Sequence, residues 1–161
     1  MILKSNNVNV GGKGSRAMMF AHGFGCDQHM WSPVARNFEE EFRVVMFDHM
    51  GSGRSDLTAY DSRKYSSLDG YADDIVEIGK ALALQDAVFV GHSVSAMIGA
   101  LATLKAPGMF SDLIMVGPSP RYIDDTGYVG GFSREQVEEL LDFLAAGKFA
   151  GQIEPSAAQK C

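Results

Sequence analysis

One stretch, Ala87 to Leu101, constrains the fold of this 161-residue chain more than any other. It begins with four apolar residues, Ala87 to Val90, which indicate a buried strand, and it ends in an apolar, alanine-rich run that is typical of a helix. Between them Ser93 has small neighbours two positions away on either side, Gly91 and Ser95. Because bulky side chains there would collide where a strand turns directly into a helix, we expect a sharp strand–turn–helix with Ser93 at its apex.

Such a turn can serve catalysis. It exposes the Ser93 hydroxyl and places the backbone N–H of Val94 at a helix N-terminus, where it can stabilise an oxyanion. The pentapeptide departs from the usual Gly-x-Ser-x-Gly pattern only at Ser95, and serine is small enough to replace glycine. A serine that merely caps the helix is an alternative that fits the pentapeptide equally well.

A second stretch favours the catalytic interpretation. Ala17 to Ala21 is an apolar strand that runs into His22, Gly23, Phe24 and Gly25. Glycines on both sides of Phe24 allow the backbone to approach a ligand closely, and serine hydrolases take their second oxyanion N–H from a loop of this kind. We therefore expect the N–H of Phe24 to join that of Val94. An ordinary strand-to-helix loop is the alternative for this stretch alone.

The remaining segments alternate between strand and helix. A buried strand is predicted at 43–47 and a further strand at 113–116, which would be an exposed apolar edge in this chain. Residues 1–10 are interpreted as an edge strand followed by a hairpin-like connection. A helix beginning at Ser32-Pro33 is expected to bury Val34 and Phe38.

A longer helix is predicted over 68–82. Its apolar face comprises Leu68, Tyr71, Ile75, Ile78 and Leu82, and its solvent face comprises Asp73, Asp74, Glu77 and Lys80. Strands that are apolar on both faces and alternate with helices indicate an α/β fold, a mostly parallel sheet flanked by helices.

Composition excludes several classes of function. The formal net charge is −6, and no basic cluster offers a surface for nucleic acid. The two cysteines, Cys26 and Cys161, have no metal-ligand spacing, and no motif implies a cofactor. No signal core or membrane-spanning run occurs, so we expect a cytoplasmic protein without a membrane partner.

Several motifs together resemble the α/β-hydrolase family. They are His22-Gly-Phe-Gly-Cys-Asp-Gln-His-Met-Trp31, Phe47-Asp-His-Met-Gly-Ser-Gly-Arg-Ser-Asp56, Leu68-Asp-Gly-Tyr71, Val90-Gly-His-Ser-Val-Ser-Ala-Met-Ile-Gly99, Gly117-Pro-Ser-Pro-Arg-Tyr122 and Gly130-Gly-Phe132. The chain is most similar to bacterial hydrolases of the RsbQ type, which regulate the general stress sigma factor. It also resembles the plant strigolactone and karrikin receptor hydrolases, which likewise have serine in place of Ser95.

The resemblance implies a domain organisation. Residues 1–126 would form the N-terminal part of the α/β-hydrolase core, and residues 127–148 the start of a helical lid, with a helix from Ser133 to about Ala146. The resemblance stops near Lys148, and residues 149–161 form a divergent tail without periodicity, which is typical of a disordered segment. A frame disruption, a truncated gene or an expression boundary would each explain such a tail.

The resemblance also assigns the site. Ser93 matches the nucleophile, and the N–H groups of Phe24 and Val94 match the oxyanion hole. The family's acid and histidine follow later strands, so this chain is expected to lack both. The histidines present, His22, His29, His49 and His92, are not expected to replace the base: His22 belongs to the oxyanion loop, His92 should point beneath the turn, and His29 and His49 are expected at the surface. Asp124 and Asp125 follow the strand after the turn, where some members of the family carry their acid. Without a histidine to orient, they are interpreted as loop carboxylates.

The expected function is hydrolysis of a small apolar ester or lactone by a truncated α/β-hydrolase with a role in stress signalling. One alternative is a small-molecule-sensing module that acts through a protein partner, which the resemblance identifies as a sensor-domain phosphatase. The other is a non-functional remnant. The isolated fragment is expected to self-associate through uncovered apolar surface.

Overall fold

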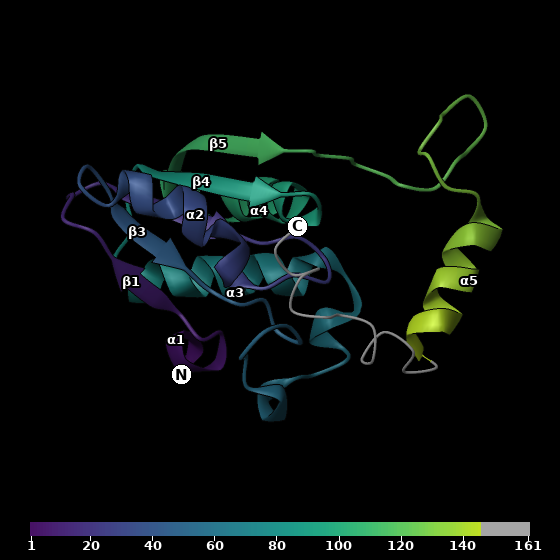
Figure 1. Cartoon of the computed structure of the whole chain (residues 1–161), viewed down its shortest axis with the longest axis horizontal. Coiled ribbons are helices and arrows are strands. Elements are labelled where there is room, and N and C mark those ends of the chain that lie inside the picture. Colours follow the sequence, from purple (N-terminus) through teal and green to yellow (C-terminus); the bar gives the residue numbers. More distant parts are fainter. Residues whose placement is uncertain (146–161) are drawn as a thin grey trace. The chain divides into compact units, whose positions relative to one another are not determined.

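The computed structural model describes residues 1–145 (Figure 1). The chain divides into two compact units, Met1–Pro118 and a second that begins at Ser119. The second unit thus begins eight residues before residue 127, the expected start of the lid. The candidate site lies wholly in the first unit.

The first unit is built on a five-stranded sheet with the order β1-β3-β2-β4-β5. β2 (Ala17–Ala21), β3 (Arg43–Met46), β4 (Ala87–His92) and β5 (Phe110–Val116) are parallel, and β1 (Asn9–Gly11) pairs antiparallel with β3. The predicted α/β class and the mostly parallel sheet are confirmed. In a parallel sheet the carboxyl ends of the strands meet at one edge, so the loops after β2, β3 and β4 converge there.

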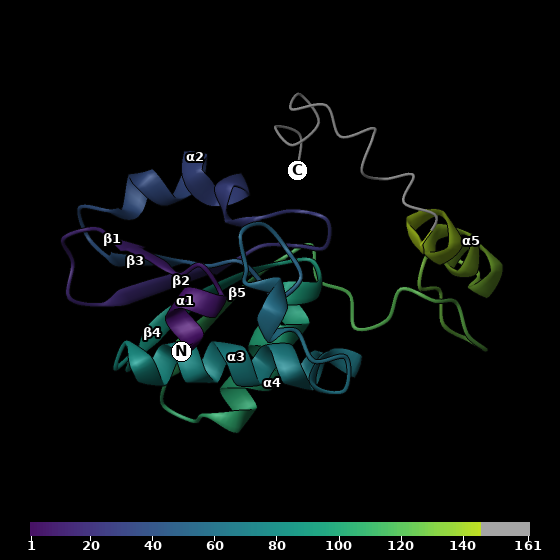
Figure 2. The same ribbon diagram turned by 90° about the horizontal axis from the view of Figure 1, so that it is seen from below.

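Helices cover both faces of this sheet, as Figure 2 shows. α2 (Ser32–Ala35) lies on one face, and α3 (Leu68–Ala81) and α4 (Val94–Lys105) lie side by side on the other. The remaining helices are α1 (Ile2–Ser5), η1 (Gln28–Trp31), η2 (Arg36–Phe38), η3 (Leu57–Ala59), η4 (Lys64–Ser66) and, in the second unit, α5 (Arg134–Ala145). None of the helices described is long and apolar enough to cross a bilayer.

The core has two halves because side chains alternate along each strand. In β2, Met18 and Phe20 pack with Trp31 and Ala35 on the α2 side, whereas Met19 packs on the side of α3 and α4. All five residues of β2 are buried, which is why this central strand has a continuous apolar sequence.

Three details of the predicted elements are wrong. Residues 2–5 are helical, so the edge strand begins only at Asn9, and it pairs with β3 rather than forming a hairpin with β2. Val34 is 43% exposed, because Ala35 faces the sheet in its place. Asp74 is fully buried instead of facing solvent.

Asp74 is buried because three partners satisfy its carboxylate. Lys64 Nζ lies 2.6 Å from Oδ1, and Tyr65 Oη and Asn6 Nδ2 donate to Oδ2 at 3.0 and 3.2 Å. A buried charge is tolerated when it is paired and hydrogen-bonded in this way. Helical periodicity cannot reveal such partners, since they come from η4 and from the residue that follows α1.

The second unit contains the helix expected for the lid. α5 starts one residue after Ser133, whose hydroxyl accepts from the backbone N–H of Gln136, while the Gln136 side chain accepts from the N–H of Ser133 at 2.8 Å. This reciprocal pair is a capping box. The tail predicted at 149–161 lies outside the described residues.

Candidate active site

The predicted sharp turn is present between β4 and α4. Ser93 has φ 56° and ψ −121°, a strained conformation for a residue with a side chain, and α4 begins at the next residue, Val94. The N–H of Ser93 donates to the carbonyl of Val116 on β5 at 2.8 Å. A Cβ on Gly91 would lie 2.5 Å from the carbonyl oxygen of Ser95, so only glycine leaves room for the helix to pass the strand.

The loop that follows β2 packs directly against this turn. A Cβ on Gly23 would meet His92 Nδ1 at 2.4 Å and Ser93 Cβ at 3.4 Å. The close approach therefore requires glycine at position 23. The next residue, Phe24, has a 73% exposed side chain, and Gly25 turns the chain with φ 75°.

A cavity of about 440 Å³ lies at the carboxyl ends of the strands. Its wall contains Phe24 and Val94, the two residues predicted to supply oxyanion N–H groups, so the structure brings these two together. The other residues of the wall are His22, Gly23, His49, Met50, Gly51, Ser52, Tyr60, Leu68, Tyr71 and Ile98. No Asp, Glu, Lys or Arg is among these residues.

The four histidines occupy very different environments. His22 is 1% exposed, and both of its ring nitrogens have partners. His29 is exposed beside Asp27, 2.9 Å from its carboxylate. The ring of His92 stands edge-on to Trp31, with 6.5 Å between centroids.

The expectation that His49 lies at the surface is wrong. It is 5% exposed and packs edge-on against Phe47 and Tyr71, and its Nε2 lies 2.7 Å from the hydroxyl of Ser95. The first residues of the loop after β3, up to Met50, are buried, which its glycine-rich sequence does not reveal.

Burial fixes the charge of both interior histidines. The pKa of His49 is lowered to about 3, mainly by desolvation and also by the neighbouring His22, while Asp48 opposes the shift. Desolvation likewise lowers the pKa of His22. Both imidazoles are therefore neutral at pH 7, and the wall of the cavity is uncharged.

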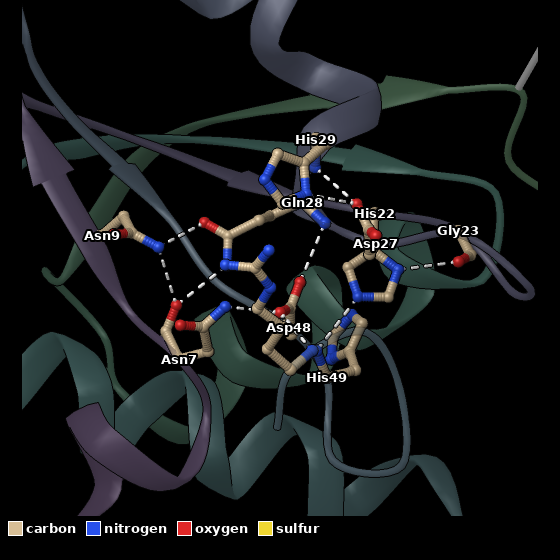
Figure 3. A network of polar contacts seen from close by, with 10 residues as sticks. Asn7, Asn9, His22, Gly23, Asp27, Gln28, His29, Asp48 and His49 are labelled. Atoms are coloured by element: carbon tan, nitrogen blue, oxygen red, sulfur yellow. Dashed lines mark hydrogen bonds and ion pairs between the residues drawn. The ribbon is translucent and has the colours of Figure 1, made fainter. Parts of the chain in front are cut away.

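Sequence reasoning missed Asp48, the residue that organises these loops (Figure 3). Its buried carboxylate accepts from the N–H of Gln28 at 2.9 Å, from Asn7 Nδ2 at 2.8 Å and from the N–H of Arg54 at 2.9 Å. Burial alone would raise the pKa of Asp48, but these hydrogen bonds outweigh it and lower the pKa. An aspartate directly after a strand and before a glycine-rich turn was the available signal.

Asp124 and Asp125 lie in the second unit and are exposed. Asp124 Oδ1 accepts from the N–H groups of Gly130 and Gly131, and Asp125 forms an ion pair with Arg121. These contacts fit their interpretation as loop carboxylates. Within residues 1–145 no group of three or more His, Cys, Asp or Glu side chains could hold a metal ion.

Comparison with known proteins decides the family. The sequence pattern of the alpha/beta hydrolase fold matches residues 16–160. The chain belongs to the α/β-hydrolase family. A strigolactone esterase from Arabidopsis thaliana is 41% identical over 145 residues, 90% of this chain and 54% of that protein. The karrikin insensitive 2 receptor CA of Petunia hybrida is 38% identical over 144 residues, 89% and 53% of the two chains.

Solved structures agree with this assignment. A hydrolase from Oleispira antarctica superposes with a TM-score of 0.87 at 41% identity, covering 92% of this chain and 55% of that one. This α/β-hydrolase chain thus spans about half the length of the relatives that it matches.

Proposed function

We propose that the whole protein is a serine hydrolase in which Ser93 is the nucleophile and the N–H groups of Phe24 and Val94 form the oxyanion hole. The observation that carries this proposal is the backbone of Ser93, with φ 56° at the junction of β4 and α4. Strain at a single serine persists where the surrounding structure enforces it, and such residues cluster at active sites. A serine that merely capped α4 would not need this geometry, and the Ser93 side chain makes no cap hydrogen bond.

The proposed reaction is acyl transfer. The Oγ of Ser93 attacks the carbonyl carbon while its proton passes to a general base, and the carbonyl oxygen becomes an oxyanion held by the two N–H groups. Collapse releases the alcohol and leaves an acyl-enzyme, which water then cleaves. The match covers only 53% and 54% of these two relatives, and we propose that the base and its acid partner come from the part that this chain does not span.

The proposed substrate is a small, uncharged ester or lactone. Support comes from the cavity beside Val94, whose wall has no formal charge and contains Leu68, Ile98 and Tyr71. A neutral ligand enters such a site without the desolvation penalty of a charge. The relative named a strigolactone esterase is consistent with an ester-type substrate.

Hydrolysis of 4-nitrophenyl acetate by the whole protein, beside its Ser93→Ala variant, tests the proposal. We expect turnover that falls by about 10⁶-fold in the variant, the usual effect of removing a triad serine. Equal rates for both proteins would refute the assignment of Ser93.

A sensing role is a second candidate, and the relatives named karrikin insensitive 2 receptors favour it. In this reading the site binds a small molecule, and a protein partner reads the occupied state. The resemblance to RsbQ-type proteins supports a cytoplasmic stress-signalling role with a sensor-domain phosphatase as partner. Signalling that survives Ser93→Ala in the whole protein would favour binding alone, and its loss would favour chemistry. A non-functional remnant would show neither activity nor signalling.

We also propose that residues 127–148 begin a helical lid in the whole protein. The capped helix α5 within this segment supports the assignment.

A further inference from the structure

The hydroxyl of Ser95 joins three separate segments of the chain. Ser95 is fully buried in the first turn of α4. Its Oγ lies within hydrogen-bond distance of the carbonyl oxygen of His22, at the end of β2, and 2.7 Å from Nε2 of His49, in the loop after β3. Glycine, the residue usual at this position of the pentapeptide, could make neither contact.

The direction of these hydrogen bonds follows from counting protons. A carbonyl oxygen only accepts, so the single proton of Ser95 goes to His22, and Ser95 must accept from His49. Nε2 of His49 therefore bears the ring proton. If the Ser95 proton pointed at His49 instead, two acceptor oxygens would face each other at the His22 carbonyl.

The ring of His22 closes the same cluster. Its Nδ1 donates to the carbonyl of Gly23 at 2.8 Å, and its Nε2 accepts from the backbone N–H of His49 at 3.0 Å. His22 is therefore held by its main chain and by both ring nitrogens. Since Gly23 follows directly and packs on Ser93, the path of the chain into Phe24 is restricted from several sides.

We propose that Ser95 and His49 are positioning residues that tie the loop of Phe24 to the turn of Ser93 and Val94. This inference rests on the proposed function, because it assigns the cluster to the two halves of the proposed oxyanion hole. Ser95 is not part of the cavity wall, and His49, which is, has its Nε2 directed at Ser95. Each acts through the His22-Gly23 segment, which sets where the N–H of Phe24 points relative to that of Val94. Oxyanion donors must be fixed before the reaction to be effective, and a loop held only by glycines would not be.

Four substitutions distinguish this positioning role from a general effect on the stability of the fold: two remove a contact of the cluster, and two serve as controls. Ser95→Ala removes the hydroxyl and keeps the small shape. His49→Phe keeps a ring that can pack on Phe47 and Tyr71 but lacks the Nε2 donor. His49→Gln restores a donor near the position of Nε2. Ser66→Ala is the matched control, because the Ser66 hydroxyl also donates to a carbonyl, that of Arg63 at 2.8 Å, but at the surface.

Amide hydrogen exchange followed by NMR provides the measurement, and it does not depend on any activity. The reporters are the N–H of Cys26, bonded to the Gly23 carbonyl, and the N–H of residue 49, bonded to His22. The reference is the exchange of amides in β2 and β4. We expect the reporters to exchange about tenfold or more faster relative to the reference in Ser95→Ala and His49→Phe, and at nearly the wild-type ratio in His49→Gln and Ser66→Ala.

A ratio that is unchanged in Ser95→Ala and His49→Phe, or a His49→Gln variant that behaves like His49→Phe, would overturn the inference. An equal increase in the exchange rates of the reporter amides and the reference amides would also overturn it, since it would indicate a loss of global stability. The ring nitrogen-15 shifts of His49 give a second readout: a proton on Nε2 is expected, and a proton on Nδ1 would contradict the assigned chain of hydrogen bonds. Failure of the Ser93→Ala assay would refute the proposed function without altering these exchange ratios.

Discussion

Replacing Asp48 by asparagine is expected to destabilise the protein strongly, although the two side chains have nearly the same shape. The carboxylate accepts three hydrogen bonds, one at Oδ1 from Gln28 and two at Oδ2 from Asn7 and Arg54. An amide has one oxygen. In its better orientation the asparagine places its one oxygen at the position of Oδ2, where it still accepts from Asn7 and Arg54, now as a neutral group. Its NH₂ group then faces the N–H of Gln28, and that hydrogen bond is lost.

The magnitude follows from this inventory. Losing one charge-assisted hydrogen bond costs about 1.5–3 kcal/mol, and converting two others to neutral bonds costs roughly 0.5 kcal/mol each. The expected loss in free energy of unfolding at pH 7 is thus about 3 kcal/mol. For a chain of this size that lowers Tm by about 6–12 °C.

The effect should depend on pH in a defined sense. The pKa of Asp48 is lowered in the folded state from 3.8, so its contribution to stability is complete above pH 3.8 and is lost as pH falls through the folded pKa. Urea unfolding at pH 7 and at pH 3 measures the difference between wild type and Asp48→Asn. The exposed carboxylate of Glu77 supplies the control Glu77→Gln, which should change stability by less than about 0.5 kcal/mol. A loss below about 1 kcal/mol for Asp48→Asn at pH 7, or an equal loss at both pH values, would refute the reasoning.

Three further substitutions follow from the same structure. Gly53→Ala should lower Tm in a thermal melt by several degrees, because Gly53 has φ 53° and a Cβ would lie 2.5–2.7 Å from the Asp48 carboxylate atoms; an unchanged Tm would contradict the packing. Asp74→Ala should cost about 3 kcal/mol in urea unfolding, because it leaves the Tyr65 hydroxyl without its acceptor and the Lys64 ammonium without its ion-pair partner; a loss under about 1 kcal/mol would contradict that. Met115→Lys on β5, which is an edge strand among the described residues, should reduce self-association seen by light scattering, and an unaltered mass distribution would argue against pairing at this edge.

The sequence predicts the central strands and the long helices well because their signals are local. Strand Ala17–Ala21 is found at its predicted bounds, and the helix predicted over 68–82 ends one residue earlier, at Ala81. The turn at Ser93 is also local, since Gly91 and Ser95 sit two residues away on either side. Periodicity and small-residue spacing act over a few residues, which is the range that a single sequence encodes directly.

The polar interior could not be predicted in the same way. Asp74 and His49 are buried against local expectation, and each has a hydrogen-bond partner far away in the sequence: Asn6, 68 residues from Asp74, and Ser95, 46 residues from His49. A lone polar residue in a pattern is assigned to solvent by default, and only the assembled fold shows which donors and acceptors meet. The turn at Ser93 is therefore predictable from the sequence, whereas the polar cluster that holds the neighbouring loops is not.

The placement of the histidines leads to a last prediction, that this 161-residue chain alone has no useful esterase activity. A general base works best with a pKa near the working pH, and burial lowers the pKa of both His22 and His49, whose Nε2 atoms already have partners. His29 is paired with Asp27 at the surface. Without its base a triad serine loses about 10⁶-fold in turnover, about 8 kcal/mol of barrier, and the oxyanion hole with binding leaves roughly 10³-fold over water. Hydrolysis of 4-nitrophenyl acetate should therefore be slow and equal for the chain and its Ser93→Ala variant. A burst that disappears in the variant would show that a base reaches Ser93, and His92, edge-on to Trp31 and next in sequence to the serine, would be the first residue to substitute.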